Sequence, residues 1–310
     1  MDDFREHLMK AISLRKRIRD TRTSTGIGWD IIEQDYVLTW VLFGISRLEK
    51  LQETLIFKGG TALKKCYFGN YRFSQDLDFS VRGDYPCGDD LLELMIKACD
   101  IATQSAEDVA FTCKRYPEKS PHPEEQEAFD IRARLPWHKD FNTSVKVEVT
   151  THEIILLEPE KRVILHEYGE HLNASIFVYK VEEIIAEKIR AILQFAKKLH
   201  ERGWGRSRVR DYYDLWRILQ EYGQQIDTAS LPLLVKKKCE SKNVMLHSVE
   251  DLFQDRLMEY LNEWDHWLTP IVPDVPERDV VIKELKQQLY KIFESDNEGV
   301  RVNRTNVGAA

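Results

Sequence analysis

The sequence predicts an α/β protein with a mixed sheet in its N-terminal part and a helical C-terminal part. Three observations lead to this prediction: helical spacing of apolar residues before residue 50, short apolar or alternating segments from 55 to 166, and a return to helical spacing after Tyr179. We therefore place an α/β domain with N-terminal helices over 1–178 and a helical domain over 179–295. Residues 296–310 are small and polar, and we expect a disordered tail there.

The bounds of the individual helices and strands are predicted from the spacing of apolar residues and from the glycine, proline and asparagine residues between them. A short apolar run ends at Gly59-Gly60, so a strand, a glycine turn and a helix opening at Thr61 are expected in that order. The predicted strands lie over 55–57, 77–81, 109–115, 128–135, 144–151 and 162–166. The later strands alternate, which favours a mostly antiparallel extension of the sheet. The predicted helices lie within 1–50, over 61–68, 91–103, 181–199 and 209–222, and further on to about 293.

Composition places the chain among soluble globular proteins. Hydrophobic residues make up 43% and charged residues 31% of the 310 positions. No run of about 18 apolar residues is present, so we expect no membrane span, and the N-terminus lacks the apolar stretch of a signal peptide. The five cysteines are scattered and never spaced as C-x-x-C, which argues against a disulfide framework and a zinc site. A cytoplasmic location is expected.

The charge is unevenly distributed. The net charge is −7, so the molecule as a whole does not resemble a nucleic-acid-binding protein. Basic residues nevertheless gather in three places: Arg15 to Arg22, Lys197 to Arg210, and Lys236 to Lys238. Each cluster could follow a phosphate backbone, and each could equally be the solvated face of a helix.

Two aspartates carry the first chemical signal. Asp76 and Asp78 are two apart in a predicted strand, so both side chains point to one face while Leu77 points to the other. Paired carboxylates repel each other unless a cation lies between them, and Mg²⁺ prefers oxygen ligands. Alone, this pattern also occurs often in surface turns.

The glycines before this strand supply a second signal. Gly59, Gly60 and Thr61 lie between a strand and a helix, where backbone N–H groups and the helix N-terminus favour an anion. An ordinary tight turn with Thr61 as N-cap explains the same residues. Together with the aspartates, however, they place a phosphate cradle and a metal site close along the chain, as nucleotidyl transfer requires.

The segment 57–80 then carries a resemblance. FKGGTALKKCYFGNYRFSQDLDFS resembles the first motif of the DNA-polymerase-β-like nucleotidyltransferases, and more narrowly that of the AbiEii/AbiGii toxin family. Three further segments resemble the later motifs in order: Lys146-Val147-Glu148, Val178 to Ala191, and Arg208 to Asp214. Glu148 departs from the usual aspartate, and Arg210 stands where lysine is commoner. The resemblance covers about half of the chain.

The resemblance implies a polymerase-β-like core, nucleoside triphosphate as a substrate, Mg²⁺ as the cofactor and an antitoxin partner. In some relatives it also implies addition of nucleotides to the acceptor end of tRNA. The metal ligands expected are Asp76, Asp78 and Glu148, with Lys188 and Asp211 as further catalytic residues. The expected nucleotide contacts are Lys58, Gly59, Gly60, Thr61, Lys64, Ser74 and Lys188. The expected RNA contacts are Arg202, Arg206, Arg208 and Arg210.

Lys188 is open to two interpretations. It lies in the middle of an apolar helical stripe, where an unpaired ammonium would cost several kcal/mol. It could form an ion pair with an acid such as Asp211, or it could contact the triphosphate.

These residues predict transfer of a nucleoside monophosphate to an RNA 3′-hydroxyl, assisted by two Mg²⁺ ions, with Asp78 or Glu148 as the candidate base. Two rivals remain: an enzyme that nucleotidylates a protein hydroxyl, and a nucleotide-binding module without turnover. The intact pair of aspartates argues against the second rival, because binding alone does not require both.

Overall fold

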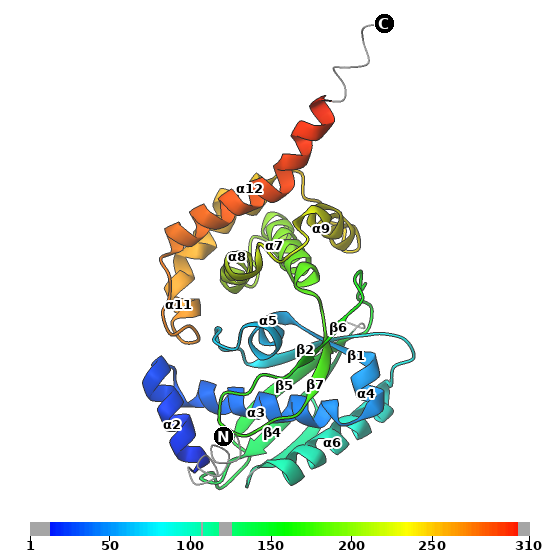
Figure 1. Cartoon of the computed structure of the whole chain (residues 1–310), viewed down its shortest axis with the longest axis vertical. Helices are drawn as coiled ribbons and strands as arrows, with labels where there is room; N and C mark the ends of the chain where they lie inside the picture. The colour runs from blue at the N-terminus through cyan, green and yellow to red at the C-terminus, as the bar shows by residue number, and fades with distance from the viewer. Residues whose placement is uncertain (1–12, 107, 118–125, 303–310) are drawn as a thin grey trace, which may run out of the picture. The chain divides into compact units, whose positions relative to one another are not determined.

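The computed structural model describes residues 13–106, 108–117 and 126–302 (Figure 1). The chain divides into two compact units. The α/β unit comprises Met1–Tyr179 and Pro270–Pro273, and the helical unit comprises Lys180–Thr269 and Asp274–Ala310. The first break falls next to the boundary predicted from the sequence, whereas the return of Pro270–Pro273 to the α/β unit was not predicted.

Within the described residues, one mixed sheet of seven strands forms the centre of the α/β unit, in the order β3-β4-β5-β2-β1-β7-β6. The strands are β1 (Leu55–Lys58), β2 (Asp76–Val81), β3 (Ala110–Arg115), β4 (Gln126–Arg134), β5 (Thr143–Thr150), β6 (Glu160–Val163) and β7 (Ser175–Val178). The pairs β2–β5 and β1–β7 are parallel and the others antiparallel. The prediction of a mixed sheet followed by helices is confirmed, and β7 is a strand that the sequence reading missed.

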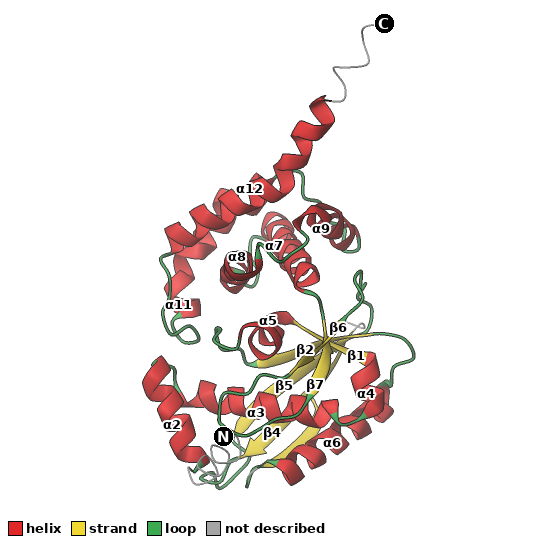
Figure 2. Ribbon diagram, viewed as in Figure 1, coloured by secondary structure: helices red, strands yellow, loops and turns green. Residues whose placement is uncertain are grey.

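The two faces of the sheet differ because side chains alternate along each strand. Leu77, Phe79 and Val147 are fully buried on one face. The helices of this unit are α2 (Leu14–Thr25), α3 (Trp29–Ser46), α4 (Glu49–Thr54), α5 (Gly59–Ala62), the π-helix η1 (Leu63–Phe68) and α6 (Gly88–Ser105). Helices α3 and α6 contact each other and the sheet, and α5 contacts β1 and β2 (Figure 2).

The helical unit is built around α7, which contacts α8 and α9. Its helices are α7 (Val181–Arg202), α8 (Val209–Tyr222), η2 (Thr228–Ser230), α9 (Leu231–Glu240), η3 (Val249–Leu252), α10 (Asp255–Tyr260), η4 (Leu261–Glu263), α11 (Trp264–Leu268) and α12 (Arg278–Val302). The segment predicted as a tail is therefore helical as far as Val302, and 303–310 lie outside the described residues. No helix in the described ranges is long and apolar enough to cross a membrane.

Candidate active site

The glycine turn forms the first turn of a helix and does not precede it. Helix α5 begins at Gly59, two residues before the Thr61 start that the sequence predicted. Gly59 has a φ of +79°, and a Cβ there would lie 2.6 Å from Oδ2 of Asp78. A side chain there would be strained by the backbone conformation and would also displace the carboxylate of Asp78. The backbone of Gly59 consequently lies directly against one of the two aspartates.

Thr61 has a different role from the N-cap that was considered for it. It lies inside α5, is almost fully buried, and its hydroxyl donates a hydrogen bond to the backbone carbonyl of Asp76. This contact ties the glycine helix to the start of β2. The helix N-terminus and the aspartate strand are therefore joined twice, by Gly59 against Asp78 and by Thr61 to Asp76.

Arg72 is a site residue that the sequence reading missed. Only 4% of it is exposed, and a Cβ on Gly60 would lie 2.2 Å from Nη2 of its guanidinium. Its Nη1 donates to the carbonyl of Phe73. A buried cation thus lies beside the start of α5, where it adds to the attraction for an anion. The position has no periodic signal, because its burial depends on packing against a glycine distant in the chain.

The aspartates lie where the strand pattern predicted. Asp76 and Asp78 are half-buried on one face of β2, and Leu77 between them is buried on the other. Asp78 is in register with Lys58 of β1 on one side and with Glu148 of β5 on the other. These three side chains form a row across neighbouring strands.

Several predicted ligands are engaged by partners within the chain. Glu148 forms an ion pair with Lys146, and Lys58 forms one with the buried Glu153. Lys64 lies 2.7 Å from a carboxylate oxygen of Glu167 and donates to the carbonyl of Gly69. Ser74 is half-buried in the loop that leads into β2. The roles of these residues toward a nucleotide stay predictions.

The donor set fits a divalent cation in part. Asp76 and Asp78 offer hard carboxylate oxygens on one face, beside the clearance that Gly59 leaves. Among the residues that the structure describes, however, no group of three or more His, Cys, Asp and Glu side chains is placed to hold a metal ion. Two carboxylates thus share one face, and the roles of Asp76, Asp78 and Glu148 as metal ligands stay predictions.

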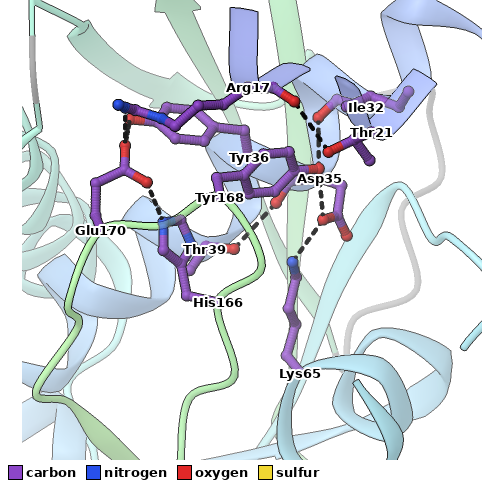
Figure 3. Close-up of polar contacts among 10 residues, drawn as sticks. All are labelled: Arg17, Thr21, Ile32, Asp35, Tyr36, Thr39, Lys65, His166, Tyr168 and Glu170. Atoms are coloured by element: carbon purple, nitrogen blue, oxygen red, sulfur yellow. Dashed lines mark hydrogen bonds and ion pairs between the residues drawn. The ribbon is translucent and has the colours of Figure 1, made fainter. Parts of the chain in front are cut away.

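A buried polar cluster anchors the helix that follows the glycines (Figure 3). Lys65 on η1 lies 2.7 Å from Oδ2 of Asp35 on α3, and both side chains are inaccessible to solvent. The Tyr168 hydroxyl donates to the same oxygen of Asp35. A buried pair tolerates little displacement, because separating it would leave two charges without compensation. The position of the α5–η1 helix is therefore fixed from its far end.

Burial and charge oppose each other at Asp35. Burial alone would raise the pKa of this carboxyl, but the charges of Lys65 and Lys64 and the hydrogen bonds from Lys65 and Tyr168 outweigh it, and the pKa is lowered. Asp35 is thus held as the charged partner of Lys65.

Lys188 in the helical unit forms the ion pair that the sequence left as one of two interpretations. Its Nζ lies 3.0 Å from Oδ1 of Asp211 and 2.6 Å from Oδ2 of Asp214. Asp214 is fully buried and Asp211 is also contacted by Arg208, at 3.4 Å. The helices α7 and α8 are joined by this group of charges.

The predicted RNA contacts differ in exposure. Arg202 and Arg206 are exposed, whereas Arg208 and Arg210 are half-buried. The Arg210 guanidinium lies 5.6 Å from the centre of the Trp267 ring.

The α/β unit thus has a glycine-initiated helix against a strand that bears two same-face aspartates, and a helical unit follows it in the chain. The fold is similar to that of MenT4, a nucleotidyltransferase toxin from Mycobacterium tuberculosis H37Rv, with a TM-score of 0.60 over 91% of this chain and 88% of that chain. Sequence identity is 20%, so this likeness concerns the fold.

Residues 40–291 match the family described as nucleotidyl transferase AbiEii toxin, type IV toxin–antitoxin system. The chain belongs to this family, and the resemblance stated from the sequence is confirmed. None of the curated proteins matches the chain. Membership makes the protein a nucleotidyltransferase toxin of abortive-infection type, and implies a nucleoside triphosphate substrate, a divalent metal and an antitoxin.

Proposed function

We propose that the protein transfers a nucleoside monophosphate from a nucleoside triphosphate to the 3′-hydroxyl of an RNA, with tRNA as the preferred acceptor. The contact between Gly59 and Asp78 carries the proposal. It brings a helix N-terminus suited to phosphate against an oxygen suited to a cation.

Different residues of the α/β unit would bind the metal and the triphosphate. Asp76 and Asp78 would hold divalent metal, with Mg²⁺ as the candidate and Glu148 as the third ligand. When bound, the metal supplies positive charge that polarises the α-phosphate and acidifies the attacking hydroxyl. The first backbone N–H groups of α5 would accept the triphosphate, and the buried Arg72 would add positive charge beside them. Asp78 and Glu148 remain the two candidate bases.

The acceptor is inferred from charge. Six Lys and Arg residues and a single carboxylate, Glu201, occur between Lys197 and Arg210, a composition suited to a polyanion. The same core could serve a protein hydroxyl, as the rival interpretation holds, and the experiment must separate the two.

The first prediction concerns Asp78. Asp78→Asn removes one of two charges that a dication needs, so transfer is expected to fall to background while the fold survives. Asp84→Asn is the matched control, because Asp84 is fully exposed and forms a surface ion pair with Lys50. Each protein is incubated with Mg²⁺, one α-labelled nucleoside triphosphate at a time, and total RNA or total cell protein.

Label in discrete small RNAs that disappears with Asp78→Asn and persists with Asp84→Asn would support the proposal. Label in protein alone would move the assignment to the protein-modifying rival. Nucleotide binding without any label would favour the binding module.

A further inference from the structure

Trp204 is an aromatic side chain placed in solvent. Its exposed fraction is 70%, whereas the other tryptophans, all within the described residues, are buried or half-buried. An indole carries a large apolar surface, and leaving it in water forgoes the stabilisation that burial would bring. A single exposed apolar residue is common on protein surfaces, so exposure alone has no functional meaning.

The backbone next to Trp204 packs against α7. Gly203 ends α7 in the left-handed conformation, with a φ of +78°. Gly205 lies so close to α7 that a Cβ there would be 2.8 Å from Cε2 of Phe195. Phe195 is itself packed edge-to-face on Tyr260, with 4.9 Å between the ring centres. The loop therefore runs back along α7, and the exposed Trp204 precedes the point where Gly205 packs on Phe195.

The charges along this loop have one sign. Arg202 and Arg206 flank Trp204 and are both exposed. Further along, Arg208 reaches Asp211, which is paired with Lys188. The exposed indole thus lies in a run of cations that follows α7 back toward the Lys188 group. We call residues 202–208 the basic loop.

We propose that Trp204 stacks on an unpaired base of the RNA acceptor while Arg202 and Arg206 contact the flanking phosphates. The inference rests on the proposed function and names the part of the acceptor that is recognised, a single-stranded segment. Every base presents a π-face, and an aromatic ring between two cations matches the alternation of base and phosphate in a single strand. Among the described residues, Trp204 is the one large exposed apolar side chain of the basic loop.

The test measures equilibrium binding of the full-length protein, without nucleotide, to three RNA hairpins. One has an unpaired 3′ overhang, one has the same overhang with abasic nucleotides, and one is blunt-ended. Trp204→Ala is expected to weaken binding to the first by about 5- to 150-fold, with little change for the other two. Trp204→Phe should restore much of the affinity. Leu233→Ala is the matched control, because Leu233 is 57% exposed and lies on α9, outside the basic loop.

The salt dependence of RNA binding distinguishes the contribution of the Trp204 indole from that of the neighbouring arginines. Arg206→Gln should reduce the slope of log K against log salt by about 1, whereas Trp204→Ala should leave the slope unchanged. Equal binding of the overhang hairpin by Trp204→Ala and the unaltered protein would overturn the stacking proposal, even if RNA is still labelled by the active enzyme. A wild-type enzyme that labels only protein would overturn the proposed function. If Trp204→Ala weakened neutralisation by the antitoxin and left RNA binding intact, the basic loop would be a protein-docking surface and the stacking proposal wrong.

Discussion

Gly59 shows how one residue can bring a backbone turn close to a side chain of the candidate site. Its left-handed backbone disfavours a Cβ, and a Cβ there would also displace the carboxylate of Asp78. Gly83 has a similar φ of +63°, but a Cβ there would meet no atom within 4 Å. An alanine at Gly83 would therefore meet only the strain of the left-handed backbone. An alanine at Gly59 would meet the same strain and would also displace the carboxylate of Asp78.

The prediction compares Gly59→Ala with Gly83→Ala. Each should lose about 1–2 kcal/mol of unfolding free energy, because alanine disfavours the left-handed region. Only Gly59→Ala should lose transfer activity, since only there is an aspartate pushed aside. Urea unfolding and the labelling assay measure the two effects, and equal activity in both variants would contradict the assigned role of the contact.

Lys188 was open to two interpretations, an ion pair with an acid or a contact with the triphosphate, and the structure shows the ion pair. Replacing it by Met keeps the length of the side chain but removes the cation shared by Asp211 and the fully buried Asp214. We predict that Lys188→Met costs about 3–5 kcal/mol in unfolding free energy, as expected when one partner of a buried pair is removed. Lys188→Met/Asp214→Asn should recover part of this loss, and urea unfolding measures both variants.

The same variant tests the nucleotide role. If affinity for nucleoside triphosphate is unchanged when Lys188→Met is measured under conditions where it remains folded, then the ion pair is structural. A loss of affinity with unaltered stability would instead support direct contact with the triphosphate.

At the scale of elements, the segment from His166 to Glu170 holds α2 and α3 together. Glu170 accepts from Arg17 of α2 at 2.7 Å and from the Tyr36 hydroxyl of α3 at 2.9 Å, and its second oxygen lies 2.7 Å from Nε2 of His166 (Figure 3). Burial would raise the pKa of Glu170, but the hydrogen bond and charge of His166 and the charge of Arg17 outweigh it, and the pKa is lowered.

This shift predicts a loss of stability in acid. A carboxyl whose pKa is lower in the folded state stabilises the fold above its unfolded pKa, and this stabilisation disappears as the pH falls through the folded value. Unfolding free energy should therefore decline below about pH 4.5, with Asp35 contributing in the same direction. Glu170→Gln should be less stable at neutral pH and should show a shallower decline.

Glu250→Gln is the control for this experiment. The pKa of Glu250 is also lowered, by its hydrogen bonds with Lys286 and Tyr290, but this carboxyl is fully exposed and solvent screens its interactions. Its pH profile of unfolding free energy should follow that of the unaltered protein. Identical profiles for Glu170→Gln and Glu250→Gln would show that the buried cluster does not govern acid stability.

The elements also show what a sequence can and cannot predict. The alternation in β2 was sufficient to place Asp76 and Asp78 on one face, because strand periodicity is local. The start of α5 was misplaced because glycine usually interrupts helices, whereas here Gly59 begins one next to Asp78. β7 was missed because its four residues lie just before Val181, where the strong helical spacing of α7 begins. Arg72 could not have been found, since its burial depends on tertiary packing.

At the scale of the whole molecule, the net charge argues against binding of nucleic acid, whereas the local charge of the basic loop favours it. The chain carries a net charge of −7, so an overall attraction to nucleic acid is not expected. Any affinity for RNA must come from local surfaces such as the basic loop, where cations outnumber carboxylates. The family of the protein could be inferred from motifs in order along the chain, but the acceptor could not, because it depends on which side chains reach solvent.

The return of Pro270–Pro273 to the α/β unit has a consequence for how the protein is made. The backbone amide of Phe73, shortly before Asp76, donates to the carbonyl of Ile271 at 2.8 Å. This contact cannot form until Ile271 has left the ribosome, whereas the strands of the sheet in the described residues all precede α7 in the chain. The α/β unit is completed only after Lys180–Thr269 of the helical unit has been synthesised, and a chain that stops before residue 270 lacks the segment that contacts the loop ahead of the two aspartates.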